Sequence, residues 1–228
     1  MPKMPDIGLD ITMTAVRRPE VLKKTLHALY KNCLAPIIHQ CRLIINIDPV
    51  GDPINSADLN EVISGYFTRY IMGMPLECSY PKALRWTWGY VSAPWVLHLA
   101  DDHELVAPLN IREHMLEMKE MPTHGFRRFA VAGCDDPPSI TFDCGPALCK
   151  KAFVRRCTHL IDGSINPAAQ FAYANPRLAK KANLWNSSLY HHPCGQEPFR
   201  DLGRHWKRKN HYKKNGAVWD EFVTWEVA

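Results

Sequence analysis

Residues 95–104 read WVLHLADDHE, a short apolar run that ends in a cluster of carboxylates. The apolar part, 95–99, has the length and character of a buried strand. The aromatic-rich segment 80–93 that precedes it predicts a helix. A helix, an apolar strand and then acidic residues are typical of an α/β sheet, in which ligand-binding groups gather beyond the carboxyl ends of the strands.

The segments around this unit repeat the alternation of strand and helix. Strands are predicted at residues 7–16, 42–47, 69–74 and 126–132. Helices are predicted from Pro19, from a cap at Asn55 or Ser56, and from Pro108 to about residue 121. The nearly continuous apolar run 42–47 is typical of a central parallel strand with both faces covered. The pattern predicts an α/β fold with a mostly parallel sheet flanked by helices.

The later part of the chain is predicted to be less regular. Its predicted elements are a short strand at 140–142, helices at 146–157, from Asn166 and at 198–209, a strand edge at 189–192, and a tail. No internal repeat divides the sequence. Because 228 residues suit one domain, residues 1–228 are predicted to form a single domain with a C-terminal extension.

The composition is that of an ordinary globular protein, with 46% hydrophobic and 22% charged residues. No stretch approaches 18 consecutive apolar residues, and residues 1–6 lack the apolar core of a signal peptide. We therefore expect a cytoplasmic protein. The eight cysteines form no CxxC pair, so we expect reduced thiols rather than a closed zinc site.

Positive charge is concentrated near the C-terminus. The net charge is +5, and residues 200–214, RDLGRHWKRKNHYKK, contain one Asp among many Lys and Arg. Such a segment can meet the phosphates of a nucleotide, a nucleic acid or a membrane surface. An exposed helix face without any partner would have the same composition, and the sequence leaves both readings open.

Polar side chains follow three of the predicted strands. They are Thr14, Arg17 and Arg18 after the first strand, Asp48 after the second, and Asp101, Asp102 and Glu104 after the fourth. Because the carboxyl ends of parallel strands share one edge of the sheet, these side chains are expected to converge. Arginines can bind phosphate, and carboxylates can bind a ribose or a divalent cation. Taken singly, each could also be a solvated loop residue, a turn residue or a helix cap.

Several common motifs are absent. The sequence has no GxGxxG after its first strand and no GxxxxGK[ST], which argues against a dinucleotide oxidoreductase and a P-loop kinase. It also has no GxSxG, the nucleophile elbow of many hydrolases.

Three segments, in their order and spacing, resemble the first half of family-2-like glycosyltransferases of the GT-A fold. They are Ile11–Thr14 with Arg18–Leu26, then Leu43–Asp48, and then Lys82–Gly89 with Ala93–Asp102. The last of them matches the region of the DxD motif. The resemblance covers residues 9–108, and segment 199–206 is similar to the C-terminal ends of small members, including phage-encoded ones.

The resemblance implies a nucleotide-sugar site. Thr14 and Arg18 would lie beside the nucleotide, Asp48 would contact the base, and Asp102 would bind the metal. The sequence departs from the family at Ala100, which stands where the first Asp of the motif is expected. Asp101 would then take over that role at the ribose or the metal.

The resemblance is weaker in the second half of the chain. His192 matches a histidine that serves some GT-A enzymes as a further metal ligand, and imidazole suits Mn²⁺. Glu197 lies where inverting members carry their catalytic acidic residue. A carboxylate there could act as a base and deprotonate an acceptor hydroxyl. Asp143 is a rival for this role. Arg204, in the basic segment, could fold back on the diphosphate.

These inferences predict a metal-dependent hexosyltransferase that uses Mn²⁺ or Mg²⁺ and a nucleotide-sugar, with a UDP-sugar as the favoured donor. Residues 6–108 would form the donor half, 109–195 the acceptor half and 196–228 the basic extension. The acceptor would be a glycan or a modified DNA base, the latter in a host cytoplasm if a phage encodes the chain. A catalytically silent binding module, for a nucleotide-sugar or a nucleic acid, and a nucleotidyltransferase stay open as alternatives.

Overall fold

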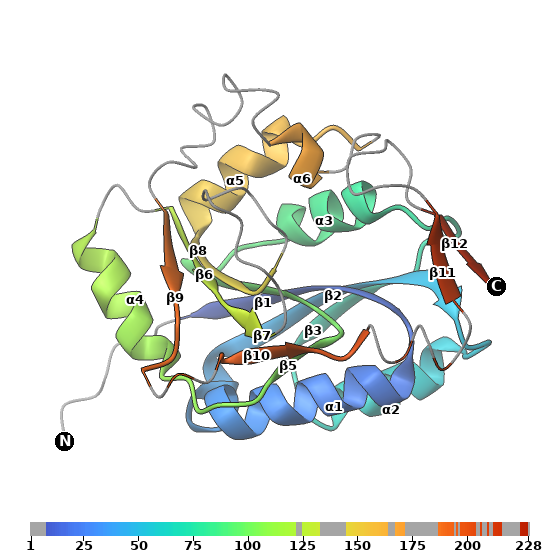
Figure 1. The fold of residues 1–228 in the computed structure, drawn as a ribbon, viewed down its shortest axis with the longest axis horizontal. Coiled ribbons are helices and arrows are strands. Elements are labelled where there is room, and N and C mark those ends of the chain that lie inside the picture. Colours follow the sequence, from blue (N-terminus) through green and yellow to red (C-terminus); the bar gives the residue numbers. More distant parts are fainter. Residues whose placement is uncertain are drawn as a thin grey trace.

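The computed structural model describes residues 8–121, 125–132, 145–163, 167–171, 187–193, 195, 197–203, 206, 209, 212–215 and 224–227. Within them, a twisted central sheet is covered by helices on both faces (Figure 1). The predicted α/β class with a mostly parallel sheet is confirmed.

The central sheet has seven strands in the order β3-β2-β1-β4-β8-β6-β9. Their bounds are β3 Tyr70–Gly73, β2 Cys41–Gly51, β1 Leu9–Arg17, β4 Trp95–Ala100, β8 Ala147–Lys150, β6 Phe126–Phe129 and β9 Ser187–Tyr190. The first four strands of this order run parallel to one another. β8 is antiparallel to both of its neighbours, whereas β9 is parallel to β6. The carboxyl ends of β1, β2 and β4 therefore lie at one edge.

Helices cover the two faces of the sheet in separate groups (Figure 1). One group comprises α1 Pro19–Leu29, α2 Ser56–Ser64 and α4 Ile111–Glu120, with the π-helical turn η1 Tyr30–Leu34 and the 3₁₀ turn η2 Ala35–Gln40. The other comprises α3 Tyr80–Gly89, α5 Lys151–Leu160 and α6 Pro167–Gln170. Each group closes its own apolar cluster against the sheet.

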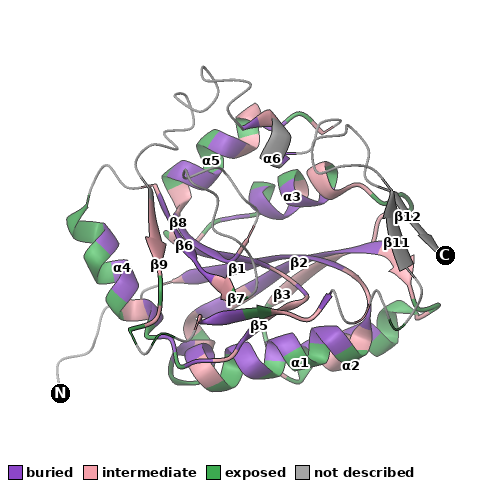
Figure 2. Cartoon of the chain, in the orientation of Figure 1, coloured by how far each residue is buried: buried purple, intermediate pink, exposed green. Residues whose placement is uncertain are grey.

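The central strands are buried on both faces, as Figure 2 shows by their colour. On β1, Leu9, Ile11 and Met13 enter the core beneath α1 and α2. The alternate residues of β1 face α3 and α5 because side chains of a strand alternate between its two faces. A strand that is buried on both faces requires an apolar run like 42–47. This is why the sequence of that segment correctly predicted a central strand.

Helix α1 starts directly after the site-bearing end of β1. Pro19 occupies its first turn, where the missing N–H costs nothing. Leu22, Leu26 and Leu29 are buried at helical spacing against the sheet. Residue 18 is the N-cap and has non-helical backbone angles. The Arg18 side chain is thereby held at the carboxyl edge of the sheet.

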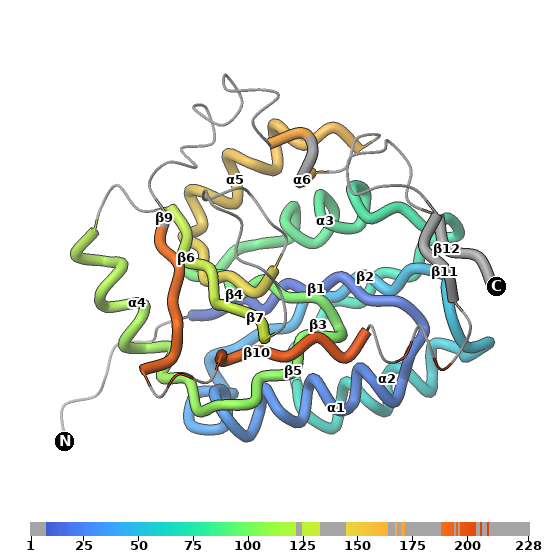
Figure 3. Tube along the Cα trace, in the orientation of Figure 1, coloured from blue at the N-terminus to red at the C-terminus, as the bar shows by residue number. Residues whose placement is uncertain are grey.

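A small second sheet joins the C-terminal part of the chain to the segment that follows β4. Its strands are β5 His103–Leu105, β10 Phe199–Asp201 and β7 Val131–Ala132, in that order. β10 pairs antiparallel with β5, so it lies directly beside the residues that follow Asp102 (Figure 3). Strands β11 Tyr212–Asn215 and β12 Thr224–Val227 form a separate antiparallel pair.

Four local predictions are wrong in secondary structure. Residues 147–150 form strand β8 instead of the first turns of a helix, and α5 starts only at Lys151. The predicted helix at 198–209 begins as strand β10, and the expected tail contains β11 and β12. The predicted helix after Pro108 begins at Ile111. Pairing with β4 and β5 overrides local propensity in the first two cases, because main-chain hydrogen bonds are supplied from distant segments.

The loop predicted at 48–53 is partly strand. β2 continues to Gly51, whose φ of +108° lies in the region that favours glycine. A Cβ at this position would lie 2.4 Å from the carbonyl oxygen of Arg17. Glycine therefore allows the ends of β2 and β1 to approach closely, and this closeness brings Asp48 to the same edge as Arg18.

Two further expectations concern the thiols and the membrane. Cys33, Cys41, Cys78, Cys149 and Cys157 are free thiols, and the other cysteines lie outside the described residues. No helix in the described ranges is long and apolar enough to cross a bilayer.

A buried imidazole lies in the middle of the sheet. His98 on β4 is 2% exposed, and its Nδ1 accepts a 3.4 Å hydrogen bond from Trp88 Nε1 and lies 3.0 Å from Thr12 Oγ1. Within the described residues its Nε2 has no hydrogen-bond partner. Burial lowers the pKa of His98 to about 3, so the folded protein holds this ring neutral.

This burial predicts a pH-dependent loss of stability. The unfolded chain protonates His98 near pH 6.5 and the folded chain only near pH 3, so stability falls as the pH drops from about 6.5 toward 3. Between pH 7 and pH 5 the group accounts for about 2 kcal/mol of that loss. The variant His98→Asn keeps a polar group near Nδ1 but cannot titrate. Urea unfolding at both pH values should show a smaller loss in this variant, and an equal loss would refute the assignment.

Candidate functional site

The ends of β1 and β4 create an acidic turn. Thr14 pairs with Ala100 across the two strands, and its carbonyl oxygen accepts a 3.1 Å hydrogen bond from Asp101 N. The chain then turns through Asp101 and Asp102, and Ala100 N donates to His103 Nδ1 at 3.0 Å. The two aspartates are therefore fixed by backbone hydrogen bonds at the carboxyl edge of the sheet.

Arg18 joins both aspartates into one ionic cluster. Its Nε donates to Asp101 Oδ2 at 3.1 Å, and its Nη2 donates to Asp101 Oδ1. The same Nη2 donates to Asp102 Oδ2 at 3.0 Å. Arg18 and Asp101 are 5% and 2% exposed, whereas the Asp102 side chain is 16% exposed. A planar guanidinium that binds one carboxylate with two nitrogens holds its geometry well.

The protonation of this cluster follows from burial and pairing. Burial alone would lower the pKa of Arg18, but the charges of Asp101 and Asp102 raise it above its ordinary value. Burial raises the pKa of Asp101, and the Arg18 charge acts against that rise. Since Arg18 stays charged, Asp101 serves as its counter-ion at neutral pH.

The C-terminal segment packs on this cluster. Leu202 N donates to the carbonyl oxygen of Asp102 at 2.8 Å, and the Trp206 ring lies 5.2 Å from the guanidinium carbon of Arg18. A Cβ at Gly203 would lie 2.1 Å from Asp102 Oδ2. Only glycine therefore fits between this segment and the carboxylate, and the C-terminal part forms one wall of the site.

Asp48 is the second buried carboxylate at this edge. Asn46 Nδ2 donates to its Oδ1 at 2.8 Å, and Ser79 N donates to its Oδ2 at 3.2 Å. The Cys78 thiol lies 3.4 Å from the same Oδ2 and donates to it. Burial raises the pKa of Asp48, while these three hydrogen bonds act against the rise. The carboxylate is thus oriented before any ligand arrives.

A pocket of about 410 Å³ opens beside Asp48. Its lining combines a carboxylate, an amide, a lysine and an indole: Asn46, Asp48, Pro75, Leu76, Glu77, Ser79, Lys82, Ala83 and Trp86. This volume is in the range of small-ligand sites. The flat Trp86 ring and the polar group of Asp48 together suit a heterocyclic base.

A smaller pocket of about 330 Å³ lies between α1 and the segment that contains β10 and Trp206. Lys24, Arg200, Trp206 and Lys209 are among its lining residues. Arg200 is exposed and pairs with Glu104. This pocket therefore combines an indole and three cations with the carboxylates of Glu20 and Asp201.

The described residues that were predicted to form a donor site lie together at this edge, but Arg18 has different partners from those expected. Thr14, Arg18, Asp101 and Asp102 form a single hydrogen-bonded group, and Asp48 lies at the end of the neighbouring strand. Arg18 was expected to face phosphate, but its charge is bound to two carboxylates. Its direct role is to hold the acidic turn in shape.

The predicted residues of the acceptor side are only partly described. Glu197 Oε1 lies 3.0 Å from His191 Nδ1, while Glu197 Oε2 is buried without a hydrogen-bond partner among the described residues. His192 follows β9, and its carbonyl oxygen accepts a 3.0 Å hydrogen bond from Gly195 N. Asp143 and Arg204 lie outside the described residues, and so do residues 140–142.

The acidic turn offers part of a cation site. Within the described ranges no three His, Cys, Asp or Glu side chains are grouped closely enough to hold a metal ion. Both oxygens of Asp101 accept hydrogen bonds from Arg18, whereas Asp102 is the more exposed carboxylate. Hard carboxylate oxygens suit Mg²⁺ or Mn²⁺, which commonly complete their shells with substrate phosphates and water. Asp102 is therefore the carboxylate of this turn that could take part in binding a metal, and its metal role stays a prediction.

The sequence did not point to several residues of the site. They are Asn46, Lys82 and Trp86 in the pocket, His191 beside Glu197, and Gly203 against Asp102. Asn46 could have been found, because alternation on β2 places it on the same face as Asp48. Gly203 could not, since its contact depends on strand β10.

Solved glycosyltransferases share this arrangement of strands and helices. S. aureus TarS has a TM-score of 0.60 at 9% identity, and the match covers 85% of this chain and 36% of TarS. The mannosyltransferase PcManGT from Pyrobaculum calidifontis, in complex with GDP-Man and Mn²⁺, has 0.57 at 10% identity, covering 82% and 55%. Glucosyl-3-phosphoglycerate synthase from Mycobacterium tuberculosis, with Mn²⁺ and UDP-Glc, has 0.50 at 11% identity, covering 80% and 68%.

The chain has the GT-A fold. This confirms the fold that the resemblance implied. The chain spans 36% and 55% of the length of the first two structures, so it corresponds to only a part of each. No protein-family model matches the sequence, and a search of curated proteins finds no match.

The Arg18 cluster predicts a large and selective effect on stability. Arg18→Met leaves the buried Asp101 carboxylate without its partner and should cost about 3–5 kcal/mol of unfolding free energy. Arg200→Met is the control, because Arg200 also pairs with a carboxylate but is exposed, and its loss should cost about 1 kcal/mol or less. Adding Asp101→Asn to Arg18→Met should recover part of the loss. Equal costs for the two single variants in urea unfolding would contradict the role of Arg18.

Proposed function

We propose that this chain is a metal-dependent glycosyltransferase that takes its sugar from a nucleotide-sugar. The observation that carries the proposal is the position of two preorganised carboxylate groups at one edge of a GT-A sheet. Asp48 borders a pocket that suits a base, and Asp102 stands on the acidic turn at the end of β4. Solved structures with this fold include TarS in complex with UDP-GlcNAc and PcManGT with GDP-Man and Mn²⁺.

The pocket beside Asp48 would hold the nucleoside. The Asp48 carboxylate can accept an N–H of uracil or of guanine, and Asn46 and Ser79 keep it in position. Trp86 offers a flat apolar face to the base. The same chemistry serves UDP- and GDP-sugars, so the predicted preference for UDP-sugars remains to be measured. Lys82, which also lines the pocket, supplies a cation for the ribose or phosphate side.

The acidic turn would hold the diphosphate end of the donor. Asp102 would bind Mn²⁺ or Mg²⁺, with His192 as the further ligand that the resemblance implies. When bound, the metal neutralises charge on the departing nucleoside diphosphate. Arg18 and Asp101 hold Asp102 in a fixed place, so that little reorganisation is needed during the reaction.

Glu197 is our candidate for the general base. One of its oxygens lies 3.0 Å from His191 Nδ1, and the second is buried and has no hydrogen-bond partner among the described residues, so a substrate hydroxyl would reach it only after the side chain moves. A carboxylate in this state can remove the proton of an acceptor hydroxyl in an inverting reaction. Asp143 remains its rival. The acceptor, a glycan or a modified DNA base in our prediction, is a hydroxyl compound in either case.

A thermal-shift screen tests the donor site. UDP-, GDP- and TDP-sugars would be added with and without Mn²⁺ to the wild type, to Asp102→Asn and to the control Asp58→Asn. A donor at 100 times its Kd stabilises the folded state by about 2.7 kcal/mol. We expect one donor to raise the melting temperature in the presence of Mn²⁺, in the wild type and in the control, because Asp58 is an exposed residue of helix α2.

The Asp102→Asn variant should fold and lose the Mn²⁺-dependent shift. The absence of a shift with every donor would overturn the proposed function. A shift that is unchanged in Asp102→Asn would place the metal elsewhere.

A further inference from the structure

A third cavity lies far from the acidic turn. It has a volume of about 500 Å³ and is formed between the η1–η2 turns and the segment that connects β5 to α4. Ile37 lies just before β2 begins, and Cys41 Sγ donates to its carbonyl oxygen, whereas Asp48 is near the other end of β2. The cavity is therefore at the amino ends of the parallel strands, and it shares no lining residue with the pocket beside Asp48.

Apolar side chains form the floor of this cavity. Ile37, Leu109 and Ile111 are between 2% and 4% exposed, and Cys33 is 6% exposed. Burial raises the pKa of the Cys33 thiol to about 12, so the sulfur carries no charge at neutral pH. A ligand that rests on this floor meets apolar surface and a neutral thiol.

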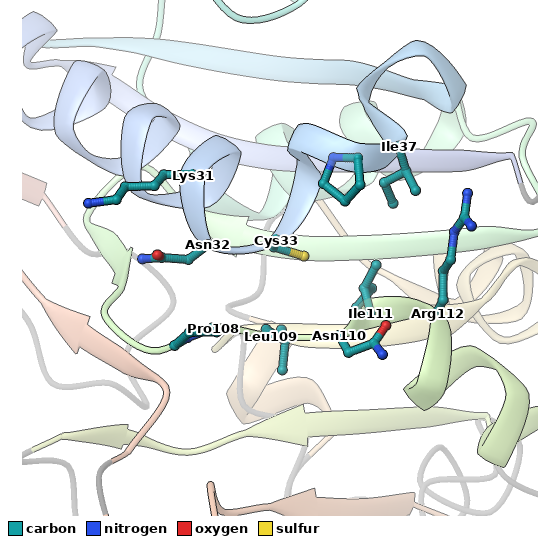
Figure 4. A pocket seen from close by; sticks show the side chains of 10 residues that line it. Lys31, Asn32, Cys33, Ile37, Pro108, Leu109, Asn110, Ile111 and Arg112 are labelled. Carbon is teal, nitrogen blue, oxygen red and sulfur yellow. The ribbon is translucent and has the colours of Figure 1, made fainter.

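Positive charge stands at the two ends of the cavity. Figure 4 shows Lys31 and Arg112 at opposite ends of the row of lining side chains, with the apolar residues between them. Among the described residues that line the cavity, these are the charged ones, and none is acidic. The amides of Asn32 and Asn110 add polar groups between the charges.

The two walls are fastened to each other, so the cavity is built into the fold. Asn32 Nδ2 donates to the carbonyl oxygen of Leu105 at 2.7 Å. Leu109 N donates to the carbonyl oxygen of Asn32 at 2.8 Å. One residue of η1 thus binds both the end of β5 and the start of the α4 segment. Preformed cavities of this size that combine an apolar surface with a few polar groups are typical of small-ligand sites.

We propose that this cavity binds a small amphiphilic anion, an aromatic or short acyl body that carries a carboxylate or a phosphate. The apolar body would lie against Pro36 and Pro108, the exposed apolar residues of the lining, above the buried Ile37, Leu109 and Ile111, and the anionic group would pair with Arg112 or Lys31. A ligand needs both a charged and an apolar part to bind here. An ion pair with a cation that is not deeply buried contributes little by itself, and the floor offers no charged group. The site is independent of sugar transfer and would exist even if the proposed function were wrong.

Fluorescence titration of the full chain tests this site with two matched probes. 8-Anilinonaphthalene-1-sulfonate has the required anion and aromatic body, and N-phenyl-1-naphthylamine has nearly the same body without the charge. We expect the sulfonate to bind at one equivalent and at least tenfold more tightly than the neutral probe. Phenyl phosphate and phenylpropionate should both compete, and the stronger competitor names the preferred anionic group.

Variants locate the probe on the molecule. The double variant Lys31→Gln/Arg112→Gln should lower the affinity for the sulfonate probe at least tenfold and leave the affinity for the neutral probe unchanged. The control Arg155→Gln alters an exposed arginine on α5 and should change neither.

Three results would overturn the proposal: no binding of the sulfonate, binding that survives the double variant, or displacement by the nucleotide-sugar. The last would place the probe in the donor pocket. Failure of the donor screen would leave this titration unaffected, so the two proposals fail separately.

Discussion

The contact between Arg18 and Asp101 is the constraint on which the candidate site depends. It joins the end of β1 to the end of β4, and it is almost completely shielded from water. A buried charge without its partner is costly, so the two strand ends are held in one relative position. Asp102, Ala100 and Thr14 are placed by this contact and by the backbone hydrogen bonds beside it. The C-terminal segment then packs on the cluster through Gly203 and Trp206.

Much of the donor half could be predicted because its signals are local. Apolar runs such as 42–47, the helix start at Pro19 and the acidic end of β4 each report a structure that neighbouring residues determine. The convergence of Thr14, Arg18, Asp48 and Asp102 at one edge followed from parallel pairing alone. The sequence could not show that Arg18 binds Asp101 instead of facing solvent, because that depends on the relative position of two strands 80 residues apart.

The second half resisted prediction because its elements are stabilised by distant partners. Residues 147–150 have helical neighbours, yet they form a strand between β4 and β6. Residues 199–201 open the basic segment that predicted a helix, yet they pair with β5 and bring Gly203 against Asp102. The cavity that Lys31 and Arg112 border is formed between η1 and the segment after β5. No local sequence pattern predicts it, because its two walls are distant in the sequence. The pocket beside Asp48 and this cavity lie at opposite ends of the parallel strands.

Product analysis tests the central claim, sugar transfer from a nucleotide-sugar, most directly. The wild type would be incubated with Mn²⁺, the donor that stabilises it, and a panel of hydroxylated acceptors that includes oligosaccharides and DNA with hydroxymethylated bases. Our account predicts release of the nucleoside diphosphate together with a glycosylated acceptor. Release of pyrophosphate would show a nucleotidyltransferase, and a bound donor that is never turned over would show a binding module. Either result would contradict the account.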